Sequence, residues 1–276
     1  MQQELSRAQS GAGIYRRLER FFNLRDPKYT AFLKKHEAAD VKQIAFYLML
    51  AVVPGFIAYF LVFHMREPIS RLTGWSDHYT QFVILALMAS GWHTFFPFFM
   101  LRWKDKLTFK QSLHYLGFTR LDLRGLILIV PIITLLFTAV SLPYMKYIYP
   151  PLHDFLNGIP MLRMEGWHIY NQGYYDFPWF LLLIGIFGNF VGEEIYFRGY
   201  LLRKLGKLKY DWLIVSVCFQ LYHMWQAPVN WSFLLLAVVI PCEIIVRLRK
   251  SIYGAIVFHI FVNVFWGEIT RALVGV

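Results

Sequence analysis

The sequence is poor in charged residues. Aspartate, glutamate, lysine and arginine make up 16% of its 276 residues, whereas a soluble domain carries roughly a quarter. The charges that are present lie between long apolar runs, several of which reach the ~20 residues needed to cross a bilayer. This composition excludes an ordinary soluble globular domain and predicts a single membrane domain.

Cysteine is also scarce. The only two, Cys218 and Cys242, fall inside apolar runs, so no disulfide framework is expected. The first forty or so residues are polar, and we therefore expect no cleavable signal peptide at this end of the sequence.

The apolar runs predict an all-α fold, a polytopic transmembrane helical bundle of about seven spans. Residues 1–42 are predicted to form a cytoplasmic arm, in which 14–24 have the pattern of an amphipathic helix. That helix would lie on the membrane surface or pack on the protein itself. Residues 43–276 would form the transmembrane domain. Its predicted spans are 43–64, 81–101, 125–145, 179–202, 212–228, 231–246 and 252–274.

Lysine and arginine alternate between rich and poor connections. The segment before the first span has nine, and the next six connections have two, six, two, four, none and three. By the positive-inside rule, the N-terminus is cytoplasmic and the C-terminus external. This sidedness explains the net charge of +11 better than nucleic-acid binding does. We expect an integral membrane protein with the lipid bilayer as its partner, and the compact chain favours a bacterial cell membrane.

Three of the predicted spans contain charged or polar groups, which are costly inside a membrane and indicate function. Glu194 and Arg198 are four residues apart on one helical face, so we predict that they form an ion pair. Glu193 is rotated by about 100° from Glu194 and is free to point elsewhere. The later spans add Phe219 with His223, and His259 with Asn263.

These groups also share a depth in the membrane. At 1.5 Å per residue, Glu193, His223, His259 and Asn263 lie roughly 10–17 Å from the inner boundary. In a water-poor pocket, a carboxylate assisted by an imidazole can activate water as a general base. An imidazole and an amide can stabilise a tetrahedral oxyanion. We assign the first task to Glu193 and His223, and the second to His259 and Asn263.

The residues alone leave other functions open. Glu193, His223 and His259 match a catalytic zinc ligand set, although the HExxH pattern is absent. A proton- or ion-coupled transporter also uses buried glutamate and histidine. A non-catalytic immunity or partner-binding protein is a further alternative. Among the other polar residues, we expect His93 to be a packing residue. We expect Glu243 to pair with Arg247 or to reach the membrane surface, and Glu268 to pair with Arg271.

The ordered motifs EExxxR, FxxxH and HxxxN in successive spans resemble the CPBP family (CAAX protease and bacteriocin-processing, also called Abi) of intramembrane endopeptidases. The resemblance covers roughly 179–265, which would be the catalytic core. It implies a glutamate-type hydrolase without a cofactor, a conical cavity that faces the cytoplasm, and a membrane-associated or lipid-modified peptide or protein substrate. It also implies roles for the motif residues: Glu193 as base, His223 as its partner, His259 and Asn263 as oxyanion donors, and Glu194, Arg198 and Phe219 as supporting residues.

Overall fold

A computed structural model describes residues 16–159, 178–223 and 239–275. Within these ranges every regular element is a helix, which confirms the all-α prediction. Five helical segments are long and apolar enough to cross a membrane, and they correspond to five of the seven predicted spans. They are Val41–Thr73, Asp77–Trp103, Gly125–Tyr147, Trp179–Lys204 and Tyr253–Val274.

The two remaining predicted spans are described only in part. Helix α13 (Asp211–His223) covers 212–223 of the predicted span 212–228, and α15 (Val239–Arg249) covers 239–246 of the predicted span 231–246. Residues 224–238 lie outside the described residues. The two helices pack against each other, as neighbouring spans would, and the total of seven spans stays a prediction.

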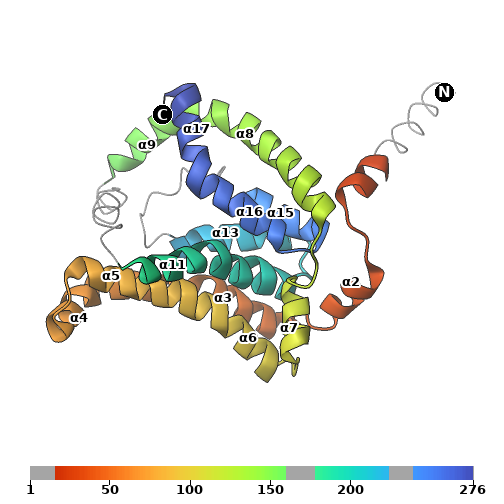
Figure 1. Cartoon of the computed structure of the whole chain (residues 1–276), viewed down its shortest axis with the longest axis horizontal. Coiled ribbons are helices and arrows are strands. Elements are labelled where there is room, and N and C mark those ends of the chain that lie inside the picture. The colour runs from red at the N-terminus through yellow and green to blue at the C-terminus, as the bar shows by residue number, and fades with distance from the viewer. Residues whose placement is uncertain (1–15, 160–177, 224–238, 276) are drawn as a thin grey trace.

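The first two spans form a helical hairpin (Figure 1). Helix α3 (Val41–Phe60) begins at Asp40, whose side chain accepts a hydrogen bond from the backbone N–H of Gln43. A helical ladder normally leaves that N–H without a partner at its N-terminus. The chain continues through η1 (Leu61–Met65) and α4 (Arg66–Thr73), and it returns through α5 (Asp77–Ala86), η2 (Leu87–Trp92) and α6 (His93–Trp103).

The third span follows a short helix, α7 (Phe109–Leu116), whose ends are both specified by the sequence. A reciprocal pair of hydrogen bonds between Thr108 and Gln111 caps its start, and Gly117, at φ 91°, ends it in a left-handed conformation that favours glycine. The span itself consists of η3 (Gly125–Ile129) and α8 (Val130–Tyr147), and α9 (Tyr149–Asn157) follows it.

The fourth span lies at the centre of the bundle. It runs through α11 (Trp179–Phe187), η5 (Gly188–Gly192), η6 (Glu194–Leu201) and α12 (Leu202–Lys204), and every residue of η6 is buried. Both η5 and η6 have the wider π-helical turn, which also occurs in η1, η2 and η3. The last span, made of α16 (Tyr253–Phe261), η7 (Val262–Trp266) and α17 (Gly267–Val274), packs against it.

The outer surface of these helices is strongly apolar. Large side chains such as Phe95, Ile127, Leu135 and Trp179 are each about 70% exposed or more. A monomeric soluble protein rarely exposes contiguous apolar surface on this scale. Together with the five apolar helices, this surface makes the chain an integral membrane protein.

All four connections rich in lysine and arginine meet at one end of the bundle. Residues 16–22 are helical, and the chain that follows is held there by two hydrogen bonds, from Arg249 to the carbonyl of Phe22 and from the Leu24 N–H to the carbonyl of Leu248. The described part of the arm therefore packs on the protein, one of the two placements that we predicted. The connections are joined by the ion pairs Asp26–Arg120, Asp105–Lys204 and Asp122–Arg249.

Candidate active site

Two ion pairs anchor the motif helix η6 inside the bundle. Arg198 donates from Nη1 to Glu194 at 3.0 Å, and both side chains are completely buried. This confirms the predicted pair. Arg198 also donates from Nε to Glu243 at 2.6 Å, which joins η6 to α15. A buried guanidinium with two carboxylates satisfies groups that would be costly if left alone.

The prediction for Glu243 was wrong. Helix α15 turns this side chain inward, where it is completely buried and reaches Arg198 rather than Arg247. Arg247 pairs with Asp211, at the start of α13. The guanidinium of Arg198 also lies over the ring of Phe219 at 4.0 Å, a favourable cation–π contact. This contact gives the first residue of the FxxxH motif a structural role.

Glu193 faces His223. The Nε2 atom of His223 lies 3.6 Å from Oε2 of Glu193, and the carboxylate is 4% exposed. The other ring nitrogen, Nδ1, lies 2.7 Å from the backbone oxygen of Phe219, one helical turn earlier. Because a carbonyl oxygen only accepts, Nδ1 carries the proton, and the free lone pair of a neutral His223 lies on Nε2, toward Glu193.

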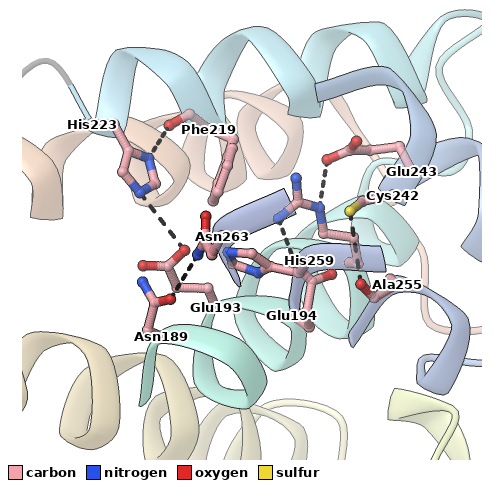
Figure 2. A network of polar contacts seen from close by, with 11 residues as sticks. Asn189, Glu193, Glu194, Phe219, His223, Cys242, Glu243, Ala255, His259 and Asn263 are labelled. Carbon is pink, nitrogen blue, oxygen red and sulfur yellow. Dashed lines mark hydrogen bonds and ion pairs between the residues drawn. The ribbon is translucent and has the colours of Figure 1, made fainter. Parts of the chain in front are cut away.

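His259, on α16, contacts the motif helix η6. Its Nδ1 lies 2.9 Å from Oε1 of Glu194, and its ring is 3% exposed. Glu194 therefore contacts both Arg198 and His259, and it fixes the orientation of the imidazole. Figure 2 shows that the ring of His259 lies between Glu194 and the group formed by Glu193 and Asn263.

Asn263 and a residue that we did not predict complete the arrangement. Asn263 donates from Nδ2 to Oδ1 of Asn189 at 2.9 Å. Asn189 lies on η5, four residues before Glu193. The structure thus brings together all four predicted catalytic residues, Glu193, His223, His259 and Asn263, as Figure 2 shows.

Two further predictions from the sequence concern His93 and the pair Glu268–Arg271. His93 is completely buried and stacks on Tyr196 with ring centroids 5.0 Å apart, and its packing role stays a prediction. Arg271 donates to Glu268 at 2.8 Å, as predicted.

Asn189 and Glu243 were missed as members of the site. Asn189 lies outside the three motifs, and Glu243 has a nearer candidate partner in the sequence.

The alternative zinc ligand set of Glu193, His223 and His259 stays a prediction. Glu193 and His223 face each other, and His259 bonds Glu194 through Nδ1, which leaves its Nε2 open. In the part of the chain that the structure describes, no group of three or more histidine, cysteine, aspartate or glutamate side chains is placed to hold a metal ion.

A comparison with known families agrees with the motifs. Residues 175–265 match the model of the Rce1-like family, described as type II CAAX prenyl endopeptidase Rce1-like. The match spans the predicted core and contains every motif residue, so it confirms the resemblance to the CAAX protease family. A search of curated proteins and a search of solved structures each found no match.

Proposed function

We propose that this chain is an intramembrane endopeptidase in which Glu193 and His223 activate a water molecule to hydrolyse a peptide bond. The observation that carries the proposal is the buried pair formed by these two side chains, within a segment that matches an endopeptidase family. Glu194 is already paired with Arg198 and His259, so Glu193 is the carboxylate of the motif that remains available for chemistry.

The two facing groups suit a shared water. A carboxylate and the Nε2 lone pair of a neutral imidazole are both acceptors, so they do not hydrogen-bond to each other directly. A water molecule can donate one hydrogen to Glu193 and the other to His223. In the reaction, the water oxygen attacks the scissile carbonyl carbon while Glu193 takes a proton. The carbon–nitrogen bond then breaks, and that proton passes to the leaving amine.

His259 and Asn263 are placed to stabilise the oxyanion formed in this attack. The amide of Asn263 has two N–H groups, of which Asn189 uses one. A doubly protonated His259 donates from Nε2, and Glu194, bonded to its Nδ1, balances the positive charge. Charge-assisted donors of this kind stabilise developing negative charge strongly in a water-poor site.

The substrate that we propose is a membrane-associated or lipid-modified peptide. The support is the membrane setting of the site and the description of the matched family, which names prenyl endopeptidases. Peptides with a prenylated cysteine near the C-terminus are therefore the first class to test. We also propose that the site opens to the cytoplasm of a bacterial cell.

Comparative peptidomics tests this function. Membranes from cells that carry the wild-type chain should contain cleavage products that are missing with Glu193→Gln. The matched control is Glu268→Gln, at an exposed ion pair far along the last span, which should give the wild-type pattern. If Glu193→Gln accumulates normally and yields the same products as wild type, the chain is not this peptidase. A transporter or a partner-binding protein would then fit better.

A further inference from the structure

Asn189 lies outside the three motifs but contacts Asn263, one of the four proposed catalytic residues. It lies on η5 four residues before Glu193, so the two share a face of the helix. Its amide oxygen accepts the hydrogen bond from Asn263. Figure 2 shows this bond in the same group of side chains as Glu193.

The orientation of the Asn263 amide decides whether Asn263 can donate a hydrogen bond to an oxyanion. An amide presents donors at one end and an acceptor at the other. Its terminal torsion is broad and roughly two-fold, so an unrestrained side chain interchanges those ends. An oxyanion is stabilised by the N–H end and repelled by the oxygen end. Asn263 is exposed, whereas Glu193 and His259 are buried, so tight packing does not hold its side chain.

The backbone of Asn189 is closely packed. It stands between Gly188 and Gly192, where the chain passes close to the second span. A Cβ at Gly188 would collide with Ser90, and one at Gly192 would collide with the backbone of Ala89. This close packing of η5 on η2 fixes the backbone of Asn189. A functional group supported from a rigid element keeps its productive geometry better than one left to rotate.

We infer that Asn189 is a positioning residue that holds the Asn263 amide with one N–H free for the oxyanion. The inference rests on the proposed function. While the Asn189 oxygen is directed at Asn263, only the N–H end of the Asn263 amide can bond to it, which disfavours the flipped orientation of Asn263. In this role Asn189 acts through Asn263, so its contribution to the rate should disappear when Asn263 is absent.

A kinetic double-mutant cycle tests this inference. The probe is an internally quenched peptide with a farnesylated cysteine three residues from its C-terminus, and the enzyme is the full chain in lipid nanodiscs. Asn263→Ala should lower kcat by about 10²–10³-fold, the cost of one oxyanion donor. Asn189→Ala should lower kcat by about 10–100-fold, as loss of an outer-shell partner does, and should leave KM unchanged. The double variant should match Asn263→Ala. The control is Leu183→Ala, an exposed position earlier in the same span.

Two results would overturn the inference: wild-type kcat in Asn189→Ala, or a double variant whose loss is the product of the two single losses. If wild type and Glu193→Gln both leave the probe intact, the proposed substrate class fails. The amide pair is then judged by thermal unfolding. Asn263→Ala should lower Tm more in the wild-type background than in Asn189→Ala, and equal shifts would show that the two amides do not interact.

Discussion

Arg198 is the residue on which the geometry of the site most depends. It bonds Glu194 and Glu243, and Glu194 in turn orients His259. All three charged side chains are completely buried, where water does not replace a lost partner. The guanidinium therefore connects the motif helix, α15 and the last span.

Arg198→Ala should consequently destabilise the protein more than Glu193→Gln does. Removing one partner of a buried ion pair typically costs about 3–5 kcal/mol, and here Glu243 would lose its ion-pair partner while Glu194 would keep only His259. The measurement is folded yield by size-exclusion chromatography, with Tm in detergent. Arg271→Ala breaks an ion pair that is 70% exposed, so it should behave like wild type. A wild-type Tm for Arg198→Ala would contradict the network.

Sequence reasoning identifies single functional residues where a side chain has few favourable environments. Charges inside an apolar span are rare and costly, so Glu193, Glu194 and Arg198 stand out without a structure. The partner of Glu243 was missed because the four-residue spacing rule considers only the same helix. The role of Asn189 was missed because a neutral amide in a span carries no comparable penalty.

Two aspartates stabilise the elements at the lysine- and arginine-rich end of the bundle. One of them, Asp26, caps the start of α2 (Pro27–Lys34). A hydrogen bond from the backbone N–H of Tyr29 and one from Arg120 hold the pKa of Asp26 below its ordinary value of 3.8. Burial raises the pKa of Asp122, but hydrogen bonds from Arg249 and from the Gly125 N–H outweigh it and lower that pKa below 3.8 as well. Both carboxylates are therefore stabilising when ionised.

These lowered pKa values predict an acid-sensitive junction at this end of the bundle. A depressed folded-state pKa contributes stability above the unfolded pKa, and that contribution is lost as the pH falls through the folded value. The Asp26→Asn, Asp122→Asn double variant should thus have a lower Tm than wild type at pH 7, and the gap should shrink at pH 3. Asp154→Asn, at an 84% exposed side chain, is the control. An equal gap at both pH values would refute the prediction.

Helix existence was predictable for five spans because their apolar runs are long and their ends carry charges or turn residues. The π-helical turns of η5 and η6 were not predictable, since the apolar pattern does not distinguish them from α-helical turns. The boundary between α13 and α15 falls in residues 224–238, outside the described residues.

At the scale of the whole molecule, the distribution of lysine and arginine in the sequence agrees with the contacts between the connections. The arm and the three later connections rich in lysine and arginine are joined at one end by ion pairs. Figure 1 shows the arm and α7 at the right end of the bundle, with α4 and α9 at the opposite end. Because the positive-inside rule assigns such connections to the cytoplasm, we predict that this end faces the cytoplasm.

Reporter fusions test this sidedness. A reporter active only in the cytoplasm should work when fused before residue 16, and one active only outside should work when fused after residue 275. A fusion in the connection 203–209 should report the cytoplasm, and one in 74–76 should report the outside. Two termini on the same side would remove the seven-span arrangement.

The central claim is that Glu193 activates water for peptide hydrolysis, and the rate of peptide cleavage by purified enzyme tests it most directly. The measurement compares wild type, Glu193→Gln and the control Glu268→Gln on the farnesylated quenched peptide, each with and without a strong zinc chelator. Loss of a general base costs about 10²–10⁴-fold in rate, so Glu193→Gln should be nearly inactive. The control should match wild type, and the chelator should change nothing. Equal rates for Glu193→Gln and wild type, or activity that is lost to the chelator and restored by zinc, would contradict the account.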